Sequence, residues 1–173
     1  MKIRDAELDE IIRVNQAGEY GARRIYEGQL DALKNEEDKA IILHMYEQEQ
    51  KHLDYFDKEI AERRIRPTLM QPLWKTVGYI MGLISAKLGN EAAMACTAAV
   101  EEVIDQHYAE QIDRLSEIGD HEELVKALKS FRAEEVEHKD IGLRKSGGEG
   151  KYRLYKSFIR GLTKAAIGIS KKI

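Results

Sequence analysis

The sequence of 173 residues contains one cysteine, two prolines and few aromatic side chains, which make up 7% of the chain. With Cys96 alone, no disulfide can form within the chain and no iron–sulfur cluster can be held by its thiolates. We therefore expect a reducing compartment, with Cys96 as a small core residue. Few prolines and aromatics, combined with 34% charged residues, favour long amphipathic helices over a β sandwich.

Long hydrophobic runs are also missing. The longest uncharged stretch, Thr76 to Ala86, is far shorter than the ~20 residues that a membrane-spanning helix requires. The first ten residues, MKIRDAELDE, are too charged for a secretory signal and too acidic for a transit peptide. We expect a protein that is soluble or lies on a membrane surface without crossing it.

Acidic side chains are absent from two segments. Residues 151–173 carry seven Lys or Arg and no acid, so the other 150 residues hold 21 basic against 31 acidic side chains. The second acid-free stretch, Arg63 to Asn90, is rich in large apolar residues. A basic amphipathic helix is typical of a membrane surface, and the alternative is a helix that closes a bundle. We expect one membrane-facing surface rather than a nucleic-acid site, because the apolar content exceeds what phosphate contacts need.

Apolar residues recur at spacings of three and four over four long stretches, as in amphipathic helices. The predicted helices cover about 5–33, 35–64, 90–119 and 120–145, with a basic helix at about 151–170. They form two antiparallel hairpins, about 5–64 and 90–145. Residues 65–89 hold both prolines and a short apolar helix, which is long enough for a crossover along a bundle. The predicted fold is all-α, a four-helix bundle with a helical crossover, forming a single domain over 1–173.

Six side chains that commonly bind metals interrupt the apolar stripes of these helices. They are Glu19, Glu49, His52, Glu101, Glu135 and His138. Four of them form two Glu-x-x-His tetrads, and residues three apart share one helix face, so each tetrad can present an oxygen and a nitrogen to one ion. A buried, unpaired carboxylate costs several kcal/mol or takes up a proton, and bound cations remove that cost. This arrangement is the known ligand pattern of ferritin-like di-iron proteins.

The two hairpins repeat the pattern, since each supplies one lone Glu followed by one tetrad. Four carboxylates carry −4 and two ferrous ions carry +4, so the reduced site would be near neutral. Mixed oxygen and nitrogen ligands suit iron or manganese better than a thiolate-rich zinc site. We therefore predict two bound ions, either iron, with which the charge count agrees, or manganese, because the ligands alone do not fix the metal. The alternative is a helical bundle in which these charges lie on the surface.

Further candidates flank the predicted ligands. Tyr108 lies on the apolar stripe two turns after Glu101, with His107 beside it. We predict that this pair contacts substrate or carries protons and electrons near the metals; the alternative is a core tyrosine and a partly exposed histidine. Asp105 and Asp140 are candidate hydrogen-bond acceptors for the ligand imidazoles, with solvated helix charges as the alternative.

Four stretches in order resemble the demethoxyubiquinone hydroxylases of ubiquinone biosynthesis. They are Val14–Ala22 with Arg24–Tyr26, Glu49–His52, Cys96–Glu102 with His107–Tyr108, and Phe131–Gly142. The resemblance covers essentially the whole chain and implies a membrane-associated di-iron monooxygenase, which hydroxylates the ring of a demethoxyubiquinol with dioxygen and a reductant. It assigns the six ligands above to iron, and His107 and Tyr108 to electron delivery and substrate binding. Mitochondrial chains of this family carry a transit segment, so we expect a bacterial member.

The resemblance also implies partners and a location. We expect an isoprenoid quinol substrate, no nucleic acid, and a peripheral position on the cytoplasmic face of the bacterial inner membrane. A homo-oligomer or a partner protein of ubiquinone biosynthesis is a further possibility. Three other functions stay open at this point: a ferritin-like iron oxidase or storage protein, a di-iron hydroxylase acting on tRNA, and a purely structural helical module.

Overall fold

The computed structural model describes residues 5–119 and 121–172. They form six α-helices: α1 (Asp5–Ala32), α2 (Glu36–Arg63), α3 (Gln71–Lys87), α4 (Asn90–Ile118), α5 (Glu122–Lys145) and α6 (Arg153–Ser170). The described residues contain no strand, so the prediction of an all-α, ferritin-like bundle is confirmed. The predicted helices match the observed ones to within a few residues, although the predicted start of the fifth helix at Asp120 lies outside the described residues.

Helix ends follow from local chemistry. The Asn35 side chain accepts a hydrogen bond from the backbone N–H of Asp38, which caps α2. Gly89 precedes α4 with a φ of 122°, and Gly119 ends it with a φ of 80°. Both angles lie in the range that favours glycine, so these two residues set the length of α4.

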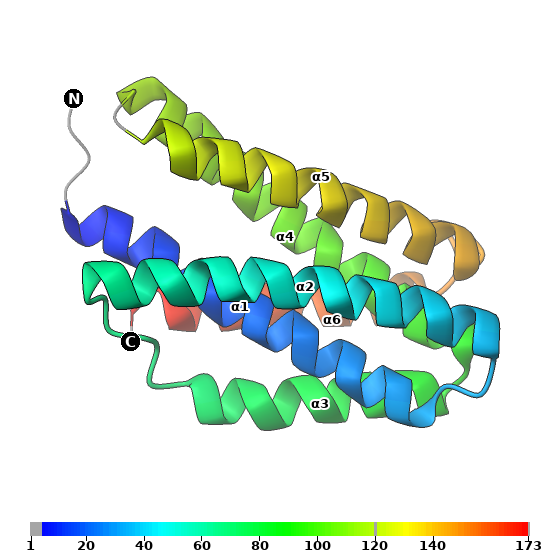
Figure 1. Cartoon of the computed structure of the whole chain (residues 1–173). Helices are drawn as coiled ribbons and strands as arrows, with labels where there is room; N and C mark the ends of the chain where they lie inside the picture. Colours follow the sequence, from blue (N-terminus) through cyan, green and yellow to red (C-terminus); the bar gives the residue numbers. More distant parts are fainter. Residues whose placement is uncertain (1–4, 120, 173) are drawn as a thin grey trace.

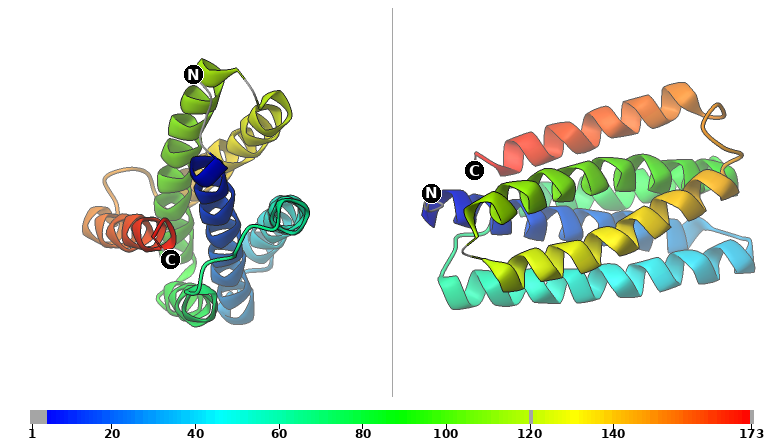
Figure 2. Two further views of the ribbon diagram at one scale, coloured as in Figure 1. Left: turned by 90° about the vertical axis from the view of Figure 1, so that its left-hand side faces the viewer. Right: turned by 90° about the horizontal axis from the view of Figure 1, so that it is seen from above.

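Helices α1 and α4 form the centre of the bundle (Figures 1 and 2). Helix α2 packs on α1 and α5 packs on α4, forming the two hairpins, which meet where α2 contacts α5. Helices α3 and α6 cover the other side of the central pair, with α3 packed mainly on α1 and α6 mainly on α4. The tetrad-bearing helices therefore lie on one side of the bundle, and the two acid-free helices lie on the other.

Helix α3 sits unusually close to α1 because glycines line the contact. A Cβ atom built on Gly82 would lie 1.9 Å from the carbonyl oxygen of Ile25, and one built on Gly28 would lie 2.1 Å from that of Tyr79. The two backbones therefore touch directly, and no other residue type fits at these positions. This contact fixes the crossover helix along the bundle.

We expect Gly82→Ala to destabilise the protein by at least ~1–3 kcal/mol, the usual cost of overpacking, because the obstacle is backbone rather than a flexible side chain. Gly161→Ala in α6 is the matched control, since a Cβ there meets nothing within 4 Å. It should stabilise the helix by about 0.5–1 kcal/mol. Urea unfolding of the metal-free proteins measures both, and a Gly82→Ala variant as stable as the parent would contradict the close contact.

Helix α6 has one face buried against the bundle and another that is exposed. Ile159 and Lys156 are buried against the bundle, and the Lys156 ammonium donates to the carbonyl oxygen of Gly148 at 3.0 Å. Leu154 and Phe158 are 82% and 63% exposed. One face of α6 therefore closes the bundle while another presents apolar side chains. Within the described residues, no helix has both the length and the apolar character to span a bilayer.

Candidate metal centre

The six predicted ligands meet in the core of the bundle, and each is at most 1% exposed. They fall into two overlapping groups, Glu19, Glu49, His52 and Glu135 in one, and Glu49, Glu101, Glu135 and His138 in the other. Within each group the candidate ligand atoms all lie within 4.8 Å of one another. Glu49 and Glu135 belong to both groups, so two ions, if bound, could share these carboxylates as ligands. We call the two groups the His52 position and the His138 position.

Most of the buried side-chain atoms of the described residues that lack a hydrogen-bond partner are atoms that would bind metal, and the others are Gln16 Oε1 and Arg23 Nε. Among the described residues, no hydrogen bond is made by Nδ1 of either histidine, by either carboxylate oxygen of Glu49 and Glu135, or by Oε2 of Glu19 and Glu101. Buried polar atoms in native proteins nearly always have a partner. Orphaned atoms gathered in one place, all of metal-ligating type, fit a pair of bound cations.

Short distances across the bundle show how closely the orphaned atoms converge. Nδ1 of His52 lies 3.1 Å from Glu135 Oε1 and 3.4 Å from Glu19 Oε2. Nδ1 of His138 lies 3.3 Å from Glu49 Oε1 and 3.3 Å from Glu135 Oε2. Both imidazoles therefore turn Nδ1 toward the shared carboxylates.

Without metal, burial and the neighbouring charges shift the pKa values of these buried groups. Desolvation, followed by repulsion from Glu135, raises the pKa of Glu49 and of Glu101 well above the ordinary value. Burial alone would lower the pKa of His52, but the nearby Glu135 and Glu19 carboxylates outweigh it and raise that pKa to about 11. The metal-free centre therefore holds protons that a bound cation would displace.

The outer imidazole nitrogens contact residues that the sequence analysis missed. His52 Nε2 lies 3.3 Å from Glu134 Oε2, and His138 Nε2 lies 2.9 Å from Gln48 Oε1. Glu134 and Gln48 could have been recognised from the sequence, because each directly precedes the Glu of a tetrad.

The prediction that Asp105 accepts a hydrogen bond from a ligand imidazole was wrong. Its carboxylate accepts hydrogen bonds from Arg132 at 2.7 Å and Lys139 at 2.8 Å, both on α5. These cations also outweigh the effect of burial and hold the pKa of Asp105 below its ordinary value. Asp140, the other candidate, is exposed at the surface of α5.

Two tyrosines hold the two lone glutamates. Tyr108 donates to Glu19 and Tyr26 donates to Glu101, so each hydrogen bond joins α1 to α4. Each tyrosine follows the lone Glu of its own helix by seven residues and binds the lone Glu of the other helix. Burial, followed by repulsion from nearby carboxylates, raises the pKa of both phenols well above the usual value, so both stay protonated and act as donors.

His107 lies at the end of a polar chain. Gln111 donates through Nε2 to His107 Nε2 at 2.9 Å and accepts at Oε1 from Asn15 at 2.9 Å. Burial, helped by repulsion from Lys171, lowers the pKa of His107 to about 4. The imidazole is therefore neutral at pH 7, and its Nδ1 carries the proton because Nε2 accepts from Gln111.

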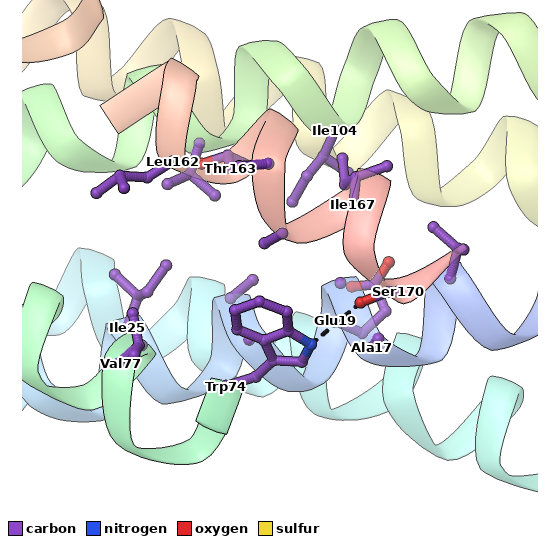
Figure 3. Close-up of a pocket in the computed structure, with 18 of the residues that line it drawn as sticks. Ala17, Glu19, Ile25, Trp74, Val77, Ile104, Leu162, Thr163, Ile167 and Ser170 are labelled. Carbon is purple, nitrogen blue, oxygen red and sulfur yellow. Dashed lines mark hydrogen bonds between the residues drawn. The ribbon is translucent and has the colours of Figure 1, made fainter. Parts of the chain in front are cut away.

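An apolar cavity of about 270 Å³ leads to one side of the centre. It lies between α3 and α6, with α1 and α4 beneath it (Figure 3). Glu19, His107 and Tyr108 line it, so both predicted catalytic residues and one predicted ligand meet there. Trp74 Nε1 donates to Ser170 Oγ at 3.0 Å and joins α3 to α6 beside the cavity (Figure 3). The other five predicted ligands do not line this cavity.

Comparison with known proteins adds to this geometry. The sequence family described as ubiquinone biosynthesis protein COQ7 matches residues 6–170. The chain belongs to this family. Over 169 aligned residues, the chain is 45% identical to the 3-demethoxyubiquinol 3-hydroxylase of Rhodospirillum rubrum. This alignment covers 96% of this chain and 78% of that relative. The chain is 44% identical over 171 residues to the mitochondrial NADPH-dependent 3-demethoxyubiquinone 3-hydroxylase of Homo sapiens, covering 97% and 79%.

Membership of the COQ7 family confirms the predicted resemblance and the prediction of a hydroxylase of ubiquinone biosynthesis. It removes the support for an iron-storage protein, a tRNA hydroxylase or a structural module. The relative in Rhodospirillum rubrum supports the expected bacterial member. The roles of individual residues and the identity of the metal stay predictions.

Proposed function

We propose that this protein is a di-iron monooxygenase that hydroxylates the ring of a demethoxyubiquinol with dioxygen and a reductant. The observation that carries the proposal is the pair of overlapping ligand groups with orphaned, buried atoms, placed beside an apolar cavity. A pair of iron ions held by the six ligands would supply the activation of dioxygen. The protein supplies orientation and excludes water from the site.

The residues of the cavity suit a quinol with an isoprenoid tail. The ring would lie against Tyr108 and His107, next to Glu19, while the tail follows the apolar walls between α3 and α6. Tyr108 keeps its proton and donates it in a hydrogen bond to Glu19, which would help to orient that carboxylate. His107 is neutral at pH 7 and its Nδ1–H is free of the bond to Gln111, so it can donate to a quinol oxygen.

Iron analysis and quinone profiling test this proposal together. Freshly purified protein should contain about two iron ions per chain, one for each ligand group. Cells that lack the protein should accumulate a demethoxy quinone, and the purified enzyme should convert its quinol form. An iron-free protein, or an unchanged quinone profile, would overturn the assignment.

The exposed face of α3 and α6 suits a membrane surface. Exposed apolar side chains on these two helices include Leu73, Val77, Ile80 and Ile84 of α3 and Leu154, Phe158, Leu162 and Ile169 of α6. Exposed lysines accompany them, among them Lys75, Lys164 and Lys172. We propose that this face rests on the cytoplasmic side of the bacterial inner membrane, with the cavity receiving the quinol from the bilayer. A second copy of the chain, or a partner protein of ubiquinone biosynthesis, is a further partner that the same apolar side chains would suit.

Removing positive charge from α6 and from the residues just after it should weaken binding to anionic vesicles. A lysine near an anionic surface contributes about 1 kcal/mol, so Lys164→Gln with Lys172→Gln should lower the partition coefficient by roughly 30-fold at low salt. Point changes are preferable to deletion of 151–173, because α6 also forms a wall of the cavity. The control is Lys126→Gln with Lys129→Gln, two exposed lysines of α5 on the opposite side of the bundle. Equal losses in both double variants would refute a specific membrane face.

Metal should be released as the pH falls. The metal-bound state needs neutral His52 and ionised glutamates, whereas in the metal-free state the pKa values of His52, Glu49 and Glu101 are all raised, so the metal-free form binds more protons. Lowering the pH therefore favours the metal-free form. Dialysis against a chelator should remove the iron near pH 4 and much more slowly near pH 8. Full retention of iron near pH 4 would contradict these ligands.

A further inference from the structure

The metal centre has an internal two-fold relationship that reaches beyond the six ligands. Each hairpin supplies a lone Glu, a tyrosine that holds the lone Glu of the other hairpin, and a tetrad. The relationship also includes the residue that precedes each tetrad. Gln48 of α2 contacts the histidine of the α5 tetrad, and Glu134 of α5 contacts the histidine of the α2 tetrad.

The two halves differ in the chemistry of the groups that accept from the two imidazoles. His52 meets a carboxylate oxygen of Glu134, whereas His138 meets the amide oxygen of Gln48. If each histidine held a metal through Nδ1, its ring proton would lie on Nε2, and both contacts would be hydrogen bonds donated by the histidine. Hydrogen bonds to a charged acceptor are roughly twice as strong as neutral ones. A carboxylate acceptor therefore makes His52 the more basic and more electron-rich ligand.

Glu134 presents a partly exposed carboxylate. Its side chain is 31% exposed, so water solvates the carboxylate, and its ion-pair contact among the described residues is with His52. Gln48 is partly buried and carries no charge at any pH. The longer distance at Glu134, 3.3 Å against 2.9 Å, is thus offset by a full negative charge.

A second asymmetry coincides with the first. Glu19, which belongs to the His52 position alone, lines the apolar cavity together with Tyr108. Glu101, which belongs to the His138 position alone, is held by Tyr26, and neither of these two residues lines the cavity. The position with the carboxylate-supported histidine is therefore the one that faces the substrate.

We propose that Glu134 is a positioning residue that acts through His52 and makes the cavity-facing position the tighter of two unequal metal sites, with Gln48 leaving the inner position weaker. This inference rests on the proposed di-iron function. Its consequence is a fixed order of loading, in which the ion nearest the substrate binds first and is lost last. Partners of ligand histidines commonly change metal affinity by 10–100-fold, which is the size of effect expected here.

Single-position variants allow each site to be measured alone. Glu101→Ala removes a ligand from the His138 position and leaves the His52 position complete, whereas Glu19→Ala does the reverse. Co²⁺ titrations against a competing chelator at one fixed pH then give the affinity of the remaining site from its visible absorbance. Circular dichroism of the metal-free variants checks that they stay helical.

Exchanging the two acceptors tests the assignment with matched changes. In the Glu101→Ala background, Glu134→Gln should weaken Co²⁺ binding by roughly 10–100-fold, and Gln48→Glu should change it by a few-fold at most. In the Glu19→Ala background, Gln48→Glu should tighten binding by a similar factor, and Glu134→Gln should have little effect. With all six ligands present, Glu134→Gln combined with Gln48→Glu should reverse the order in which the two sites fill.

Mössbauer spectra of ⁵⁷Fe-loaded protein provide a second measurement if a single-position variant fails to fold. The parent should show two unequal iron sites, and Glu134→Gln should change one signal while Gln48→Glu changes the other. Equal effects of Glu134→Gln on both sites, or none on either, would overturn the inference while leaving a two-iron protein intact. A parent protein that binds no metal would overturn the proposed function as well, so the two failures are distinguishable.

Discussion

Replacement of Glu135 by alanine is expected to remove both metal ions and to abolish hydroxylation. Glu135 is fully buried and belongs to both ligand groups, so the change deletes a ligand from each site at once. Outer partners of ligand residues already change affinity by 10–100-fold, so loss of a shared ligand should reduce activity by more than ~100-fold. Iron content and turnover of the purified variant measure the effect.

The controls for this substitution lie on the same bundle. Glu137→Ala, two residues along α5 and exposed, should retain about two iron ions per chain and normal turnover. Glu101→Ala should retain about one ion, because Glu101 belongs to one group alone. The Glu135→Ala protein itself should stay helical, since the remaining carboxyls can take up protons. Unchanged iron content in Glu135→Ala would rule out this centre.

The helices and the six candidate ligands were predictable because they depend on periodicity within one helix. A spacing of three and four residues places side chains on one face, and Glu19 or His138 stands out as a polar residue on an apolar face. The cap at Asn35 and the helix break at Gly89 are local in the same way, since both depend on backbone chemistry within a few residues.

Partners across the bundle were not predictable in the same way. Asp105 lies one turn after Glu101 and was expected to hold a ligand imidazole, but Arg132 and Lys139 of α5 bind it instead. The relative register of α4 and α5 decides that contact, and periodicity within each helix does not report register. Gln48 and Glu134 were missed for the same reason, although their repeated position before each tetrad is visible once the pairing is known.

The structure also refines where the substrate path should be probed. Val77 of α3 is 40% exposed and lines the apolar cavity, so it lies both at the proposed membrane face and at the entrance to the centre. Ile80, on the same helix, is exposed but does not line the cavity. Val77 is therefore a position at which a charge would oppose entry of a lipid-borne quinol.

We expect Val77→Asp to retain its iron but to turn over a long-tailed demethoxyubiquinol poorly. An ionised side chain costs about 2.5–3.5 kcal/mol at the centre of a bilayer and less near its surface, so kcat/KM should fall by roughly 10–100-fold. The kcat/KM for a tailless, water-soluble quinol should fall only a few-fold, because this substrate does not need an apolar path.

Thr76→Asp is the control, because it places the same charge on an exposed neighbour outside the cavity. It should leave the turnover of both substrates nearly unaffected. Because both substrates meet the same metals, the ratio of their losses separates access from chemistry. Equal losses with both quinols would mean that the aspartate damages the centre itself, and the path between α3 and α6 would have to be abandoned.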